Sequence, residues 1–323
     1  MSLLTVSGSP HIQSRETTRS VMWTVIIALM PAFLVGIYYF GMDALMITLT
    51  AVAACVVFEW AIQRFLIKGE TTISDGSAII TGILLAFNLP SSTSLWVVVL
   101  GSLFAIGVGK MSFGGLGKNP FNPALVGRAF LFLSFPTQVA ISEWPCPQPI
   151  FTSKITDVLT GPTPLMNLQS GDAVCAWNMF FGSTGGSFGE VSAIAIIIGG
   201  LYMLLRRVIT WHIPVSYLGS AALFALILWL INPNEFINPI FHLLAGGIML
   251  GAIFMATDMV TSPIYKSGQI VFGIGCGVLT ILFRQFGPMP EGASFAILIM
   301  NALTPLINKA FKPKRFGYSK IKE

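Results

Sequence analysis

The stretch VMWTVIIALMPAFLVGIYYF at residues 21–40 decides the fold class of this chain. It contains no charged side chain, and its length matches the about 20 apolar residues that a membrane-spanning helix needs. Across the 323 residues, 54% are hydrophobic and only 10% are charged, whereas soluble domains carry about 25% charged residues. The composition therefore predicts an integral membrane protein.

The other apolar stretches predict further spans, giving about ten transmembrane helices in all. They cover residues 44–65, 77–89, 95–109, 120–135, 191–205, 213–231, 236–257, 268–286 and 292–311. The third and fifth spans are short for a straight membrane crossing, and proline, glycine and asparagine interrupt several others. Short, interrupted spans are typical of discontinuous helices that line a buried site. We therefore expect an all-α polytopic membrane protein with broken helices.

The chain divides into two halves joined by one long polar loop. The expected parts are a polar N-terminal arm (1–20), a first five-helix half (21–135), the loop (136–189), a second five-helix half (190–311) and a basic tail (312–323). Residues 82–87 resemble residues 247–252, which hints at an internal repeat. Because five is an odd number of spans, such a repeat has to be inverted across the membrane. Chance similarity between apolar segments explains the match about as well.

The positive charges predict the orientation of the chain in the membrane. With ten spans both termini lie on one side, and fifteen of the eighteen lysines and arginines fall on that side, Lys110 and Lys118 being counted as loop residues. Since positive loops face the cytoplasm, we expect cytoplasmic termini and an extracytoplasmic loop. Orientation thus explains the net charge of +5, and no nucleic-acid partner is expected. Residues 1–20 lack a signal-peptide pattern, so the first span is expected to direct insertion.

Four charged residues lie inside spans or at their ends, where charges are costly and often functional. Arg128 and Asp258 are the stronger candidates for an ion path, because a polar break follows Asp258. An equally weighted alternative is that Asp258 only pairs with Lys266 at a helix end. For Glu59 and Arg284, snorkelling to the membrane interface and an internal role are weighted equally.

Two asparagines, Asn119 and Asn122, open the fifth span. A buried amide needs hydrogen-bond partners, so such residues often bind a polar ligand ring. The glycine-rich turn at residues 113–117 precedes them and permits close approach of a ligand. The alternative is that the asparagines only form turns beside Pro120 and Pro123. We favour the ligand-binding interpretation slightly.

No metal centre is expected in this chain. The four cysteines form no CxxC pair, and the three histidines show no metal-ligand spacing. Cys55 and Cys276 lie in apolar spans and are interpreted as packing residues. Cys146 and Cys175 share the long loop, where free thiols are favoured over a disulfide.

The motif DVLTGPT occupies residues 157–163 of the long loop. Gly161 and Pro162 predict a turn that displays Thr163 to solvent. On these residues alone, a solvated turn without further chemistry is the default interpretation.

Five segments together give the chain a family resemblance. They are residues 9–11 (SPH), 75–78 (DGSA), 118–124 (KNPFNPA), 157–163 (DVLTGPT) and 256–263 (ATDMVTSP). With them, the whole chain resembles the NqrB and RnfD family of membrane subunits in ion-translocating redox complexes. NqrB-type members carry a longer N-terminal arm, so the short arm favours the RnfD branch, which belongs to Rnf ferredoxin:NAD⁺ oxidoreductase complexes.

The resemblance implies a covalent flavin on the long loop. In this family a flavin transferase joins FMN through its phosphate to a threonine hydroxyl, within the motif Asp-x-x-(Ser/Thr)-Gly-Ala-Thr. Asp157, Thr160, Gly161 and Thr163 match that motif, and Thr163 is the expected acceptor, with Thr160 as the rival. Pro162 stands where alanine is usual, and proline changes the turn because it fixes φ and lacks an N–H.

The resemblance further implies a second, non-covalent flavin, riboflavin, for which Asn119 and Asn122 are the expected ligands. The implied partners are the membrane lipid, the flavin transferase and the other Rnf subunits, which carry iron–sulfur clusters and another covalent flavin. The implied function is electron transfer between reduced ferredoxin and NAD⁺, coupled to Na⁺ or H⁺ translocation across a prokaryotic cell membrane. Asp258 and Arg128 are expected on the ion path. The alternative is a passive channel or secondary transporter built on the same inverted repeat, which would not need the loop motif.

Overall fold

The computed structural model describes most of the apolar chain and part of the loop. The described residues are 17–68, 72–139, 144–145, 147, 160–169, 176–182, 185–189, 192–233, 236–245, 247–287 and 292–313. Within these ranges nearly all regular structure is helical, and one two-stranded sheet is present. Asp157, Cys146 and Cys175 lie outside the described residues.

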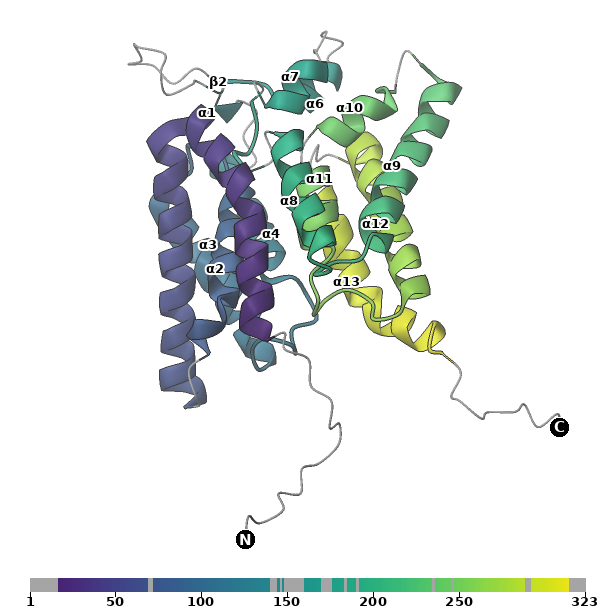
Figure 1. The fold of residues 1–323 in the computed structure, drawn as a ribbon. Helices are drawn as coiled ribbons and strands as arrows, with labels where there is room; N and C mark the ends of the chain where they lie inside the picture. The colour runs from purple at the N-terminus through teal and green to yellow at the C-terminus, as the bar shows by residue number, and fades with distance from the viewer. Residues whose placement is uncertain are drawn as a thin grey trace, which may run out of the picture.

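The first two predicted spans form two helices that share the label α1 and are joined by a sharp turn at Gly41. Helix α1 (Thr18–Ala61) bends sharply at Gly41 (φ 64, ψ −142), and its two arms stand side by side in purple in Figure 1. This backbone conformation is accessible to glycine and strained for other residues. The second arm continues into the π-helix η1 (Ile62–Ile67).

The rest of the first half follows the predicted spans closely. It contains η2 (Ile73–Asp75), α2 (Ser77–Phe87), α3 (Leu95–Gly107), η3 (Met111–Phe113) and α4 (Pro123–Ser134). Small residues allow close helix contacts, as is common inside membranes. A Cβ added at Gly82 of α2 would lie 2.7 Å from the Cα of Val52 in α1.

The second half contains one helix that is broken, as the sequence predicts. Its elements are α8 (Ala193–Leu205), α9 (His212–Ile231), α10 (Pro239–Leu244), α11 (Ile248–Leu250), η4 (Gly251–Met255), α12 (Lys266–Phe286) and α13 (Ala293–Ala310). The predicted span 236–257 corresponds to α10, α11 and the π-helix η4. The backbone is extended at Ala245 (φ −89, ψ 138), which ends α10.

The described part of the long loop lies at one end of the molecule. It contains α5 (Pro136–Val139), β1 (Trp144–Pro145), β2 (Thr160–Gly161), α6 (Pro164–Gln169) and α7 (Ala176–Phe181). The strands β1 and β2 are antiparallel. The start of α1 and the end of α13 lie at the opposite end, and the purple-to-blue and green-to-yellow halves stand side by side (Figure 1).

The two halves use a similar packing scheme. Helix α1 packs against α2 and α3, and α3 against α4; in the other half α9 packs against α10 and α12, and α12 against α13. Five helical stretches in the described residues are long and apolar enough to span a membrane, while α2, α4 and α8 are shorter. The all-α membrane fold is thus confirmed. The count of ten spans and the inverted repeat stay predictions.

Candidate functional site

A pocket opens between the two halves, at the end of the molecule where α1 begins. It contains about 750 Å³ of empty space, its open mouth included. Apolar residues from α1, α2 and η4 form much of its wall. Its polar lining residues are Ser77, Thr81, Lys110, Asn119, Asn122, Thr257 and Asp258. The structure therefore brings three predicted site residues, Asn119, Asn122 and Asp258, to one cavity.

Asn122 connects the two halves at this pocket. Its Oδ1 accepts a hydrogen bond from the Ala124 N–H (3.1 Å), which caps the start of α4. Its Nδ2 donates to the Met255 carbonyl of η4 (3.2 Å). Asn119 is also buried, and its Nδ2 donates to the Phe121 carbonyl (3.0 Å).

The Asn119 side-chain oxygen is left without a hydrogen-bond partner, although it is buried. A buried acceptor without a donor costs about 1–3 kcal/mol. A ligand that offers an N–H or O–H group at this point would recover that cost. The amides, hydroxyls and ammonium of the lining can form hydrogen bonds with a planar polar ring. Within the described ranges no group of three or more His, Cys, Asp or Glu side chains could hold a metal.

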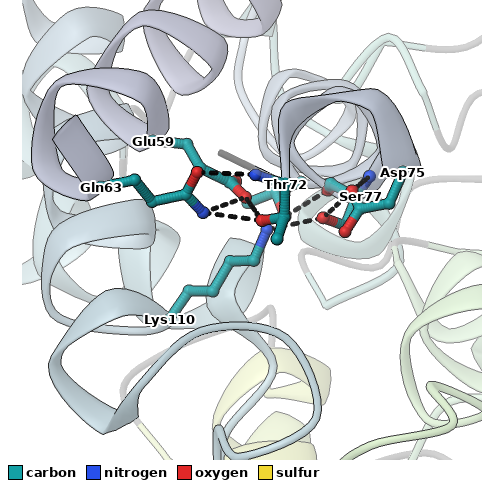
Figure 2. Close-up of polar contacts among 7 residues, drawn as sticks. Glu59, Gln63, Thr72, Asp75, Ser77 and Lys110 are labelled. Atoms are coloured by element: carbon teal, nitrogen blue, oxygen red, sulfur yellow. Dashed lines mark hydrogen bonds and ion pairs between the residues drawn. The ribbon is translucent and has the colours of Figure 1, made fainter. Parts of the chain in front are cut away.

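A buried ion pair lies beside the pocket, and the sequence did not predict it. The Lys110 Nζ lies 2.6 Å from the Glu59 Oε2, and both side chains are buried (Figure 2). Lys110 is thus not a solvated loop residue, and Glu59 does not snorkel to an interface. A charged side chain inside an apolar span needs a partner, so Glu59 was the signal of a buried ion pair in the sequence. Its partner could not be identified there, because it is 51 residues away.

Hydroxyl and amide groups surround this ion pair. The Lys110 ammonium also donates to the Ser77 Oγ (2.6 Å), and the Ser77 hydroxyl donates to the Asp75 Oδ1 (2.7 Å). The Gln63 Nε2 donates to the Thr72 Oγ1 (2.7 Å), and Thr72 lies in the middle of the cluster, between Gln63 and Ser77 (Figure 2). The cluster joins the end of the long N-terminal helical stretch, the start of α2 and the turn that follows α3.

Asp258 and Arg128 lie in different surroundings. Asp258 lines the pocket, and its Oδ2 accepts a hydrogen bond from the Thr261 Oγ1 (3.2 Å). The described residues show no ion pair between Asp258 and Lys266. Arg128 is buried and does not line the pocket; it donates to the Asn88 Oδ1 and to the Ser294 Oγ. These contacts hold α4 against α2 and α13.

Arg284 stabilises the broken helix of the second half. Its side chain is buried and donates to the carbonyls of His242 (2.7 Å) and Ala245 (2.8 Å). Carbonyls at the end of a helix have no partner within that helix, and Arg284 supplies one at the end of α10. The snorkelling alternative for Arg284 is therefore wrong.

The turn at Thr163 differs from the prediction. Pro162 is exposed, but only 8% of Thr163 is exposed, so its side chain is not displayed to solvent. The Thr163 carbonyl accepts the Asn167 N–H (3.0 Å), which places this residue at the start of α6. Leu165 then packs in a small hydrophobic cluster with Met179. This anchoring of α6 draws Thr163 inward.

The other motif residues are described only in part. Thr160 and Gly161 form β2, which pairs Gly161 with Trp144 and Thr160 with Pro145. Asp157 is outside the described residues, so its position relative to Thr163 is not assigned. Cys55 and Cys276 are buried free thiols within the core, as predicted.

Comparison with known proteins agrees with the predicted resemblance. The profile of the family described as "NQR2, RnfD, RnfE family" matches residues 5–317. The chain is 44% identical, over 99% of its length and 97% of the relative's, to the D subunit of the Na⁺-translocating ferredoxin:NAD⁺ oxidoreductase complex of Acetobacterium woodii. It is 41% identical, over 98% of its length and 96% of the relative's, to the D subunit of the proton-translocating ferredoxin:NAD⁺ oxidoreductase complex of Clostridium ljungdahlii.

A more distant relative extends this similarity. The D subunit of the ion-translocating oxidoreductase complex of Stutzerimonas stutzeri is 38% identical over 94% of this chain and 93% of the relative. The similarity covers both halves and the loop between them. The chain therefore belongs to the NQR2, RnfD, RnfE family.

Proposed function

We propose that this chain is the RnfD-type subunit of an ion-translocating ferredoxin:NAD⁺ oxidoreductase complex in a prokaryotic cell membrane. The observation that carries this proposal is end-to-end similarity to relatives that are named as such subunits. One relative is named for Na⁺ and another for proton translocation, so the proposal covers either ion. The partners are the other subunits of the complex, which supply the iron–sulfur clusters, a further flavin and the nucleotide site.

Thr163 is the proposed attachment point of FMN, through a phosphoester to its hydroxyl. The bound flavin supplies one redox station, while the protein sets its position and its electrostatic surroundings. The support is the register of Thr160, Gly161 and Thr163, together with Asp157, in the loop motif. Because Thr163 is buried in the folded chain, the transferase has to act before α6 packs or on an opened loop.

Fluorescence in a denaturing gel tests this attachment. The chain is produced together with a flavin transferase, and a fluorescent band is expected. Thr163→Val should abolish the fluorescence, and Thr160→Val should retain it. A dark wild-type band, with the transferase active on a control substrate, would contradict the covalent flavin and favour the channel or transporter alternative.

The pocket at Asn119 and Asn122 is the proposed site of a non-covalent riboflavin. Its support is the buried, unpartnered Asn119 oxygen and the polar lining around it. Riboflavin released by mild denaturation of the purified complex would be quantified by chromatography. Asn119→Leu should lower the amount released, whereas Asn238→Ala, which removes the cap of α10 outside this pocket, should leave it unchanged. Equal riboflavin in both variants would contradict this location.

Asp258 and Arg128 are the proposed polar residues of the ion path, and their roles differ. Asp258 lines the pocket, where its carboxylate can bind a cation, and Arg128 holds α2, α4 and α13 together. Ion transport by the assembled complex in vesicles tests both. If Asp258→Asn and Arg128→Leu each leave transport intact, the path does not run here.

A further inference from the structure

The Lys110 side chain belongs to two sites at once. Its ammonium contacts the Glu59 carboxylate and the Ser77 hydroxyl, both at 2.6 Å. The same side chain lines the pocket that also contains Asn119 and Asp258. Among the described residues that line this pocket, Lys110 is the only cation and Asp258 the only anion.

Three carboxylates of the described chain lie around the single Lys110 ammonium. Glu59 pairs with it directly, Asp75 reaches it through Ser77, and Asp258 lies on the pocket wall. A buried carboxylate that loses its only counter-charge is strongly destabilised. The ammonium therefore stays with Glu59 as long as the pocket holds a neutral ligand.

We propose that Lys110 is a movable counter-charge, which is shared between Glu59 and the ligand of the pocket. This inference rests on the proposed riboflavin, a ring that is neutral when oxidised and can be anionic when reduced. When an electron from a partner's redox centre gives the ligand negative charge, the flexible lysine stem lets the ammonium turn toward the pocket. The lysine keeps its proton throughout.

The movement of the ammonium toward the pocket also affects the Glu59 carboxylate. Once the ammonium turns away, Glu59 keeps hydrogen bonds from Gln63 and Thr72, at 3.4 Å each, but it has no other positive partner in the part of the chain that the structure describes. One positive charge from the aqueous phase then has to balance it. The arrival of an electron in the pocket is thereby coupled to the uptake of a cation beside it, through the Lys110 side chain.

The test compares the affinity of the complex for oxidised and for reduced riboflavin. Radiolabelled riboflavin is equilibrated by dialysis with flavin-depleted complex, and only the label is counted, so that covalently bound flavins do not interfere. The pH is alkaline, because the reduced ring is then anionic. The measured quantity is the ratio of the Kd for the reduced form to the Kd for the oxidised form. Four proteins are compared: wild type, Glu59→Gln, Lys110→Met and the double variant.

Opposite signs are expected from the two single variants. Glu59→Gln frees the ammonium and should lower the ratio by about tenfold, because it removes a competing negative charge. Lys110→Met should raise the ratio by about tenfold or more, and the double variant should stay close to Lys110→Met, because without the lysine the loss of Glu59 frees no ammonium. If Lys110→Met does not fold, the comparison of Glu59→Gln with the double variant still isolates the lysine charge, since neither contains the buried carboxylate.

A purely structural ion pair predicts another result. An ammonium fixed on Glu59 still adds its charge to the pocket, so Glu59→Gln would then change the ratio by the same factor with and without Lys110. That result, or an unchanged ratio in all variants, would contradict the movable counter-charge while the riboflavin site stands. Wild-type complex that binds neither form of riboflavin would overturn the proposed site and this inference with it.

Discussion

Glu59 and Lys110 carry opposite charges, and each side chain would be destabilising if it were buried without the other. The exposed fraction is 0% for Glu59 and 1% for Lys110, so the Coulomb attraction between them is weakly screened. The ion pair is therefore sensitive to the loss of either partner, and much less so to the loss of both.

Lys110→Met is expected to lower the free energy of unfolding by about 3–5 kcal/mol, because it leaves the Glu59 carboxylate buried without a counter-charge. The double variant with Glu59→Gln should regain most of this loss. Thermal unfolding of the purified chain in detergent measures both effects. Lys309→Met, at an exposed position of α13, is the control and should change little. A double variant no more stable than Lys110→Met would contradict this account.

Asn122→Ala is expected to destabilise the chain by about 2 kcal/mol. It removes the cap of α4, worth about 1 kcal/mol, and the hydrogen bond to the Met255 carbonyl, worth about 1 kcal/mol. Asn238 is a matched control, because it caps α10 before a proline in the same way. Asn238→Ala should cost only about 1 kcal/mol. Equal losses in thermal unfolding would show that the bond between the halves contributes nothing.

At the scale of elements, two interruptions shape the molecule. Gly41 interrupts α1 and turns the chain back, so that its two helices lie side by side. The break after α10 leaves carbonyls that Arg284 satisfies, and Asn122 satisfies the Met255 carbonyl at the end of η4. Irregular backbone at membrane depth is tolerated where protein groups satisfy it.

Gly41→Ala tests the first interruption. Alanine at φ 64, ψ −142 is expected to cost about 1–3 kcal/mol, because this region is strained for residues with a Cβ. Gly219→Ala is the control: Gly219 lies in α9 with open space around its Cβ position, and alanine there should be neutral or stabilising. The thermal unfolding midpoint distinguishes the two. If both variants unfold at the same temperature, the turn at Gly41 is not strained by alanine.

At the scale of the whole molecule, polar contacts hold the two halves together around the pocket. Arg128 bonds to Ser294, and Asn122 to Met255, across the boundary between the halves. Helix α6, which Thr163 precedes, lies at one end of the molecule, and the start of α1 lies at the other (Figure 1). Val21 and Met22 at the start of α1 line the pocket. The two proposed flavin positions are therefore at opposite ends of the helices.

Cysteine labelling in intact cells tests the orientation that follows from the positive charges. In a background without native cysteines, a membrane-impermeant maleimide should label Pro162→Cys from outside, because Pro162 is exposed in the loop. Phe113→Cys, at the pocket end and 45% exposed, should react only after permeabilisation. The reverse pattern would place both termini outside the cytoplasm.

The sequence alone determined which segments are helical and apolar. Each span has its own preference for lipid. The free energy of moving a stretch of apolar residues from water into the membrane depends on those residues and hardly on the rest of the chain. For the same local reason the break in residues 236–257, the asparagines beside the prolines and the loop motif could be identified from their own residues.

Only the tertiary structure decided the partners of the buried polar groups. Lys110 meets Glu59 across 51 positions of sequence, and Asn122 meets Met255 across 133. The burial of Thr163 likewise depends on how α6 packs against α7 and on distant apolar residues. Such partners cannot be predicted from a span's own composition, because the packing of remote helices determines which polar groups are close enough to satisfy one another.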